Sequence, residues 1–427
     1  MLQIRQYSSR ASVALALGLM ALWAPNGWAK AATTDARPWD GCSVGLGGGY
    51  TFADHNIKDT FSDSLGSSVL SLKFDGIGLK TAMAEIQVGC DKQFSEHYLA
   101  GVEADYVGAG FSVLARAGRI VDDATLLYVI GGWTRTDFSG SLGFAGLGAS
   151  VNVAADGLSF GGGAETALAE HVTAKLEYRT TNYGVTTLFN NPGETMTGES
   201  VAHSIRAIIS YRFGDVKPYA GSFDGVNWTD FHVGVGVGAG IANYTGATAD
   251  IGLSGDASSV GGKGFLGTVE GGYDVQIGPR FIVGAIGDYT KSDIASSLSL
   301  DITNFMGFSG KIEDKTAMTE SFSILGRAGV LSSPNVLWYG LGGWTRSTFA
   351  SALTLSGDLA GLLPDQSSSQ TVDGLTLGLG VETMLSQNIS WKTEYRYTRY
   401  NQQDVFSGLF AANADVMTAR SVLSYRF

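Results

Sequence analysis

The chain has 427 residues, among them 60 glycines and 7 prolines, and only 16% of the residues are charged. With 44% hydrophobic and 11% aromatic residues it is unlike an intrinsically disordered chain, and the glycines lack the three-residue period of collagen. The net charge of −12 argues against a nucleic-acid partner, because binding phosphates requires clustered Lys and Arg. We therefore expect a β-rich protein with glycines in its strands and turns.

The N-terminus carries the pattern of a secretory signal peptide. Arg5 and Arg10 precede an apolar run over residues 11–24, and small residues that suit cleavage after Ala29 or Ala31 follow it. The run is too short for a membrane-spanning helix. We predict that residues 1–31 are a signal peptide.

The sequence contains an internal duplication. "RAGRIVDDATLLYVIGGWTRTDF" at residues 116–138 returns as "RAGVLSSPNVLWYGLGGWTRSTF" at 327–349, and "AETALAEHVTAKLEYR" at 164–179 returns as "VETMLSQNISWKTEYR" at 381–396. The four letters "SYRF" end both copies. This period is far too long for a solenoid. We infer a duplicated domain, residues 39–213 and 228–427, joined by a periplasmic linker at 214–227.

Each copy contains eight strand-like segments whose connections are mostly short and long in turn. The long connections include residues 51–80, 186–200, 292–320 and 350–370. One connection departs from this order, because "VGAG" at 107–110 is short where the second copy is long. Long loops on one side and tight turns on the other are typical of an outer-membrane barrel.

The strands have one apolar and one charged face. In "VTAKLEYRT" the odd positions Lys175, Glu177 and Arg179 share a face, and Ala174 and Leu176 lie on the other. Three adjacent charges cannot be buried in an ordinary apolar core without a large desolvation cost. A soluble sandwich or lipocalin-like barrel would place them in water, but such a surface would need more charged residues. The pattern favours an all-β fold, a transmembrane antiparallel β-barrel with its apolar face toward lipid.

Following this alternation through both copies predicts ten charged positions that recur inside the barrel. They are Glu85/Glu270, Asp105/Asp288, Arg116/Arg327, Arg135/Arg346, Glu165/Glu382, Lys175/Lys392, Glu177/Glu394, Arg179/Arg396, Arg206/Arg420 and Arg212/Arg426. Aromatic residues near strand ends suit an interfacial girdle. By the same alternation, Trp133 and Trp344 are expected inside, near the outer rim.

The ordered series of motifs resembles the opacity-type porin family, the surface-antigen barrels grouped with OmpA-like eight-stranded proteins. The series comprises "WTDFHVG" at 228–234, "GGWTR", "EYR" and the final "SYRF". It covers nearly the whole mature chain, twice, whereas members typically carry one barrel. The resemblance implies the outer membrane of a Gram-negative bacterium and a structural, adhesive, weakly conducting or, in one branch, haem-binding role.

The chain end resembles a known assembly signal. A terminal Phe427 with Tyr425 two residues before it is similar to the signal that the barrel-assembly machinery recognises, and Tyr211 and Phe213 repeat it at the end of the first copy. The expected partners are therefore outer-membrane lipid and that machinery. The sequence names no ligand for the loops.

Sixteen strands in total allow two architectures. Two tandem eight-stranded barrels are favoured, because each copy carries a complementary set of charges that a narrow interior would pair, and because the linker is longer than the other periplasmic turns. The alternative is one sixteen-stranded barrel with an aqueous channel. The first predicts an outer-membrane protein with a structural or surface-loop role in envelope integrity, adhesion or ligand contact. The second predicts a general diffusion porin for small solutes.

No motif points to an enzyme. "GLSFG" at 157–161 matches the G-x-S-x-G nucleophile elbow, but it lies within an alternating strand, and the second copy has Thr376 in place of Ser159. The histidines lack metal-ligand spacing; they are His55, His97, His171, His203 and His232. We expect no catalytic, cofactor-binding or metal site.

The two cysteines suggest a disulfide. Cys42 and Cys90 lie on the apolar face near the periplasmic ends of neighbouring strands, and the periplasm is oxidising. The alternative is two thiols in the lipid belt.

Overall fold

The computed structural model describes residues 37–62, 69–108, 110–144, 147–245, 254–255, 259–305, 307–362, 364–405 and 410–427. The predicted signal peptide, residues 1–31, lies outside these residues. Within the described part of the chain, no helix has the length and apolar character needed to cross a membrane.

The first repeat consists of eight antiparallel strands. Each pairs with the next along the chain, and the eighth also pairs with the first. The strands are β1 (Gly41–Ser62), β2 (Val69–Gln93), β3 (Tyr98–Val107), β4 (Gly110–Asp122), β5 (Thr125–Phe144), β6 (Leu147–Ala169), β7 (Val172–Asn191) and β8 (Glu194–Arg212).

The second repeat follows the same order, with one small addition. β9 pairs with β11 and with the last strand, β17, and each strand from β11 to β17 pairs with the next. The two-residue β10 (Ser254–Gly255) pairs with β5 of the first repeat. The other strands are β9 (Asp230–Thr245), β11 (Ser259–Ile277), β12 (Phe281–Phe305), β13 (Phe308–Ser333), β14 (Val336–Gly357), β15 (Gln366–Met384), β16 (Ile389–Val405) and β17 (Phe410–Arg426).

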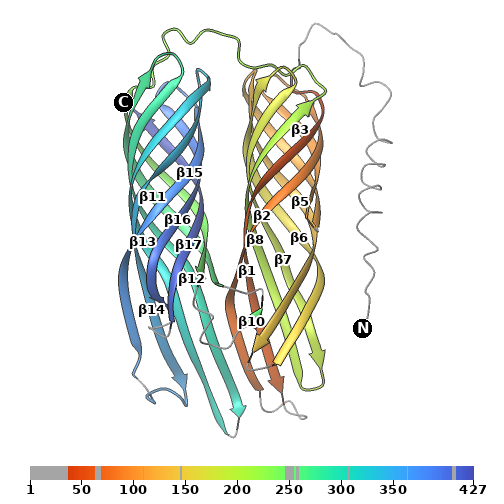
Figure 1. The fold of residues 1–427 in the computed structure, drawn as a ribbon, viewed down its shortest axis with the longest axis vertical. Coiled ribbons are helices and arrows are strands. Elements are labelled where there is room, and N and C mark those ends of the chain that lie inside the picture. Colours follow the sequence, from red (N-terminus) through yellow and green to blue (C-terminus); the bar gives the residue numbers. More distant parts are fainter. Residues whose placement is uncertain are drawn as a thin grey trace, which may run out of the picture.

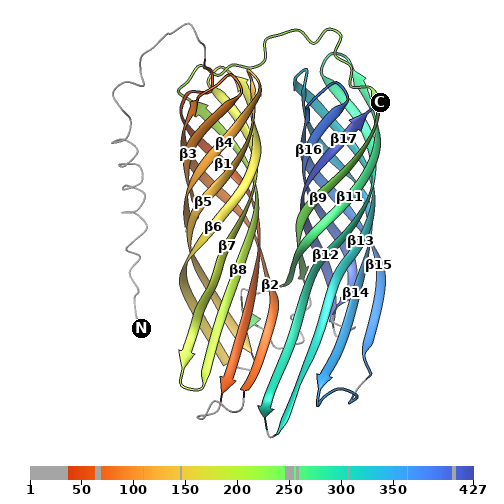
Figure 2. The same cartoon turned by 180° about the vertical axis from the view of Figure 1, so that it is seen from behind.

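The two repeats stand side by side as upright cylinders of strands (Figure 1). The linker passes between them at the top of the view, at the same end as the C-terminus and the tight turns. The view from behind shows long hairpins reaching past the cylinders at the opposite end (Figure 2). The observed all-antiparallel architecture confirms the predicted all-β fold class.

Most of the connections predicted as long loops are hydrogen-bonded hairpins instead. β12 and β13 contain 25 and 26 residues, and their ladder continues as far as Phe305 and Phe308. A strand needs only about 9–11 residues to cross a bilayer. The outer parts of the long hairpins therefore extend past the length needed to cross a bilayer, and their backbone ladders keep them paired there.

The first and last strands of each repeat pair along a seam, and their close contact there requires glycine on the inward face of the first strand. A Cβ atom at Gly47 would lie 2.7 Å from the carbonyl oxygen of Ala207 in β8, and one at Gly236 would lie 2.7 Å from the carbonyl oxygen of Ser421 in β17. Both distances are too short for a side chain. The glycine-rich openings "GLGGGY" and "GVGVGAG" therefore serve strand packing.

Cys42 and Cys90 face each other in the β1–β2 ladder and form a disulfide, with their Cα atoms 3.9 Å apart. The bond joins two strands that are already neighbours, near the end where the linker lies. It closes the long β1–β2 hairpin with a covalent bond.

Thiol labelling tests this bond. Purified protein that is denatured without reductant should take up no maleimide, and the same protein should take up two after reduction, because the disulfide consumes both thiols. Mass spectrometry of the labelled chain measures the difference. Two labels before reduction would contradict the disulfide.

Candidate functional site

The interior of both repeats is filled with charged side chains. In β7 the predicted charged face is fully buried, whereas outward-facing Val235 and Val237 of β9 are 61% and 69% exposed. Nine of the ten predicted positions are buried in each repeat. They are Glu85, Asp105, Arg116, Glu165, Lys175, Glu177, Arg179, Arg206 and Arg212, and Glu270, Asp288, Arg327, Glu382, Lys392, Glu394, Arg396, Arg420 and Arg426.

Four side chains form a closed ring of charge near the linker end of the first repeat. Arg116 binds Asp91 at 3.1 Å and also binds Glu165. Arg212 binds the same two carboxylates, Asp91 at 2.9 Å and Glu165 at 3.2 Å. Each ion in the ring thus has two partners of opposite charge, which offsets the cost of removing it from water.

The second repeat contains the same ring. Arg327 binds Asp274 at 2.7 Å and Glu382 at 2.8 Å. Arg426 binds Asp274 at 2.9 Å and Glu382 at 3.1 Å. The recurrence of a four-membered ring in two diverged copies indicates that its geometry is part of the fold.

A second charged layer lies nearer the outer end. Arg179 binds Asp105 at 2.6 Å and Glu177 at 2.7 Å, and Arg206 binds Glu85 at 2.6 Å. These bonds link β7 and β8 to β2 and β3 across the interior. In the second repeat, the corresponding layer consists of Arg396 and Arg420 with Asp288 and Glu394.

Between the layers, one lysine in each repeat has a different partner. Lys175 donates to the amide oxygen of Gln87 at 2.6 Å and lies 3.5 Å from Glu103. Lys392 donates to Glu270 at 2.6 Å. The carboxylate that balances the lysine therefore comes from β3 in the first repeat and from β11 in the second.

This arrangement corrects one predicted correspondence. Glu85 and Glu270 do not occupy equivalent places, because Gln87 lies opposite Asp105 in its ladder and Glu270 lies opposite Asp288. The equivalent of Glu270 is thus Gln87. The variable stretches between the matched segments differ in length, and the predicted pair was therefore two residues out of register.

Sequence reasoning also missed three carboxylates that pair with the predicted bases inside the repeats, Asp91, Asp274 and Glu103. A signal existed for the first two, because "CDKQ" and "YDVQ" recur with Asp and Gln at the same spacing. Gln93 and Gln276 then accept hydrogen bonds from the backbone N–H groups of Trp39 and Trp228. Glu103 has no counterpart in the second repeat and could not be found by comparing the copies.

The prediction was wrong for Arg135 and Arg346, which lie on the outward face. Their side chains are 45% and 53% exposed, and each pairs with an exposed aspartate, Asp156 at 3.3 Å and Asp373 at 2.8 Å. β5 and β14 are apolar on both faces, so their alternation does not reveal which side faces inward.

The same error applies to Trp133 and Trp344. Both were expected inside, but both are 37% exposed on the outward face. Trp133 packs edge-on against Phe111 and Trp344 against Phe322. These tryptophans therefore belong with the interfacial aromatic residues rather than with the interior.

A belt of hydroxyl groups crosses four strands on the side of the charged layers that faces away from the linker. In the first repeat Ser112, Thr134, Ser159 and Thr181 form a chain of hydrogen bonds of 3.0, 2.5 and 2.7 Å. In the second repeat Ser323, Thr345, Thr376 and Thr398 form the corresponding chain. Ser159 and Thr376 thus face the interior within long strands, with neighbouring hydroxyls as partners.

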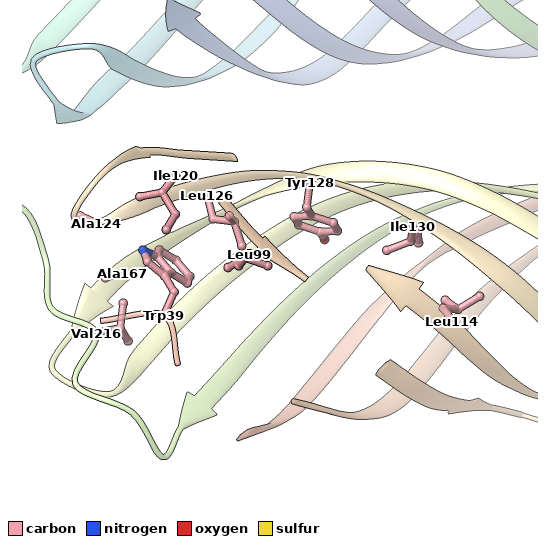
Figure 3. Packing of buried hydrophobic residues seen from close by; sticks show 10 residues of the cluster. All are labelled: Trp39, Leu99, Leu114, Ile120, Ala124, Leu126, Tyr128, Ile130, Ala167 and Val216. Carbon is pink, nitrogen blue, oxygen red and sulfur yellow. The ribbon is translucent and has the colours of Figure 1, made fainter. Parts of the chain in front are cut away.

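An apolar cluster closes the linker end of the first repeat (Figure 3). Trp39 is fully buried there with Leu126, Ile120 and Val216. Arg212 lies over the indole ring at 5.1 Å and donates to the carbonyl oxygen of Trp39 at 2.9 Å. In the second repeat, Arg426 makes both contacts with Trp228, at 4.9 and 2.6 Å. The tryptophan at the start of each copy therefore acts as a plug: it fills the linker end of its repeat and contacts an arginine of the ring of charge.

The final aromatic pairs face outward. Tyr425 and Phe427 are 47% and 66% exposed, with their rings 5.3 Å apart, and Tyr211 and Phe213 are arranged in the same way at 5.2 Å. Both pairs lie at the linker end of their repeats. They are accessible to lipid or to another protein.

The five histidines lie apart from one another. His232 is buried beside Lys392 and Asp274. His203 forms a hydrogen bond with Tyr178, and His55 forms one with Ser200. His171 forms a hydrogen bond with the carbonyl oxygen of Gly214. Among the described residues, no three side chains of His, Cys, Asp or Glu converge as metal ligands would.

A family model described as outer membrane protein beta-barrel domain matches residues 13–213 and again residues 216–427. The chain belongs to this family. The 31 kDa outer-membrane immunogenic protein of Brucella melitensis biotype 1 is 29% identical over 220 residues, which cover 49% of this chain and 88% of that protein. These matches confirm the predicted resemblance to outer-membrane barrel proteins and the predicted outer-membrane location in a Gram-negative bacterium.

Solved structures of two kinds resemble this outer-membrane barrel protein. Neisserial surface protein A matches with a TM-score of 0.27 and 18% identity over 46% of this chain and 97% of its own. A Pseudomonas aeruginosa FadL homologue matches with a TM-score of 0.25 and 11% identity over 91% of this chain and 90% of its own.

Replacing one ring carboxylate tests the interior. Glu165→Gln leaves Arg116 and Arg212 buried with half their compensating charge, and we expect the free energy of unfolding to fall by about 3–5 kcal/mol. The exposed Arg135–Asp156 pair supplies the control, since Asp156→Asn should cost less than about 1 kcal/mol. Urea titration followed by tryptophan fluorescence in lipid vesicles measures both. Equal effects of the two substitutions would contradict the buried ring.

Proposed function

We propose that this protein is a non-enzymatic outer-membrane protein built as two closed eight-stranded barrels, whose outer hairpins present a surface outside the cell. Its work is structural or adhesive, or consists of contact with a ligand at the hairpins. The role needs no cofactor and no metal. Passage of solutes through the interior is not part of it.

The strand pairing supports two separate barrels. The last strand of the first repeat, β8, pairs with its first strand, β1, along a ladder from Phe61–Glu194 to Ser43–Arg212. In the second repeat, β17 pairs with β9 along a ladder from Asn413–Thr245 to Arg426–His232. In one sixteen-stranded barrel, β8 would pair with β9 and β17 with β1. The linker would then be an ordinary turn between paired strands.

The observation that carries the proposal is the span of the buried ion pairs. Arg179 of β7 bonds Asp105 of β3, and Arg396 of β16 bonds Asp288 of β12. Within each ring of eight strands, these partners come from opposite walls. Direct contact at 2.6 Å across the interior fits an eight-stranded barrel, whose interior is just wide enough to be filled by side chains.

The filled interior supports a role at the surface. Among the described residues, the charged layers, the hydroxyl belt and the plugs at Trp39 and Trp228 fill the inside of both repeats, which supports a blocked interior. The hairpins, by contrast, extend far beyond the length needed to cross the membrane. They are the part of the molecule that can meet other molecules outside the cell.

We also propose that Tyr425 and Phe427 are the signal by which the barrel-assembly machinery receives the chain. Their exposure at the linker end supports this role, because the machinery must reach them from the periplasm. Tyr211 and Phe213, equally exposed, are the remnant of the end of an independent barrel. Outer-membrane lipid is the other expected partner.

Conductance measurements test the blocked interior. The purified mature protein in planar bilayers should give no steady openings, because ion pairs and packed side chains cross both interiors. Heat-unfolded protein in the same detergent serves as the control for leaks caused by the preparation. Steady openings in the nanosiemens range would overturn the proposal and favour the sixteen-stranded porin.

Engineered disulfides across the seams test the number of barrels. Leu46 lies opposite Ile209 in the β1–β8 ladder, and Val235 lies opposite Leu423 in the β9–β17 ladder; all four side chains face outward and are exposed. Leu46→Cys with Ile209→Cys, and Val235→Cys with Leu423→Cys, should each form a bond on oxidation in the membrane. Peptide mapping by mass spectrometry identifies the links, and the single-cysteine variants are the controls. In a sixteen-stranded barrel neither pair would form.

A further inference from the structure

Corresponding positions of the two repeats meet each other. Tyr178 and Tyr395 are the tyrosines of the two "EYR" motifs, and their rings stack with centroids 5.8 Å apart. Asp122 and Ser333, which occupy the same place in equivalent turns after Arg116 and Arg327, share a hydrogen bond. Contact between a residue and its own counterpart is the mark of a two-fold, isologous interface.

The contact surface is buried although it lies on the lipid-facing side of the strands. Phe52 of β1 is 1% exposed and its counterpart Ile241 of β9 is 0% exposed, and both belong to one apolar cluster with Met417. On the same faces of the same strands, Leu46 and Val237 are 65% and 69% exposed. The other repeat, rather than lipid, therefore covers this part of each outer wall.

Two equivalent lysines reach across the interface in opposite directions. Lys80 lies opposite Phe52 in its ladder, and Lys263 lies opposite Ile241 in the corresponding ladder. Lys80 of the first repeat forms an ion pair with Asp415 of the second, and Lys263 of the second lies 3.8 Å from Asp54 of the first. Both carboxylates are almost fully buried on the outward face.

The two carboxylates occupy the same rung of equivalent ladders. Asp54 of β1 lies opposite Val201 of β8, and Asp415 of β17 lies opposite Asn243 of β9. In each repeat this rung therefore carries one carboxylate. It lies on the first strand of the first repeat and on the last strand of the second repeat. Charged groups on a lipid-facing wall are costly unless they are paired. The reciprocal lysines supply that pairing.

We propose that the two repeats bind each other laterally through this isologous interface, as a two-fold dimer of single barrels would, and that they form one rigid body in the membrane. The proposal rests on the proposed arrangement as two barrels. The occupant of each interface is the other copy of the same domain. The outer hairpins of both repeats then stand at a fixed spacing and present one combined surface.

Outside the membrane the symmetry is broken by the short β3–β4 turn. Because β3 ends at Val107, the outer part of β2 has no β3 neighbour, and β12 pairs with it from Asp75–Ser297 to Val69–Thr303. An unpaired strand edge invites pairing with another strand. The second repeat therefore fills the gap left by the short connection at residues 107–110.

Crosslinking in the native membrane tests the interface. Tyr178→Cys with Tyr395→Cys should be joined by a short bis-maleimide. The matched control is Val113→Cys with Ile324→Cys, an equivalent pair of outward-facing, exposed positions outside the described interface. Since crosslinking follows effective concentration, we expect yields about tenfold higher for the tyrosine positions. Equal yields would overturn the proposal.

Cleavage of the linker tests whether the contacts alone hold the repeats together. A protease site inserted between the exposed residues Gly221 and Ser222 allows the folded protein to be cut, and a tag on one half should then recover the other from lipid nanodiscs. Lys80→Glu with Lys263→Glu places like charges together and should lower this recovery about tenfold, whereas Arg135→Glu should not. Separation of the unsubstituted halves would overturn the proposal.

These outcomes can be separated from failure of the proposed function. If the seam disulfides form and the tyrosine positions do not crosslink, the chain has two barrels without the lateral interface. If the seam disulfides fail, the arrangement as two barrels fails, and the interface fails with it.

Discussion

Hydrocarbon offers no hydrogen bonds, so every backbone N–H and C=O group within a bilayer must find its partner in the protein. Apart from the two-residue β10, each described strand has a partner on both sides, because β8 pairs with β1 and β17 pairs with β9. The same constraint turns the apolar side chains outward and leaves the polar ones facing each other inside. The charged interior therefore follows from the pairing of the last strand of each repeat with its first.

An interior filled with ions stays stable only if each ion is compensated. The rings formed by Arg116, Arg212, Asp91 and Glu165, and by their counterparts in the second repeat, achieve this by giving every member two partners. Such pairs specify one arrangement of the walls more than they add stability, since an apolar interior of equal volume can be as stable.

Duplication allows the requirements of the fold to be separated from its details. The charged rings, the hydroxyl belts and the tryptophan plugs recur in both copies. The partner of the central lysine has changed strand, from Glu103 to Glu270, and the interface carboxylate has moved from Asp54 to Asp415 across one ladder rung. In both cases equivalent lysines keep a carboxylate partner although the place of that partner in the sequence differs.

The sequence alone determined the duplication, the all-β fold, the outer-membrane location and nine of the ten inward charges in each repeat, because strand alternation records which face meets lipid. It failed at Arg135, Arg346, Trp133 and Trp344, where both faces of a strand are apolar. It missed Glu103, which has no counterpart, and it misplaced the long hairpins as loops. The partners of the ions, the return of each last strand to its first and the contact between the repeats were decided only by the tertiary structure, since they join residues far apart in the chain whose distances no local pattern encodes.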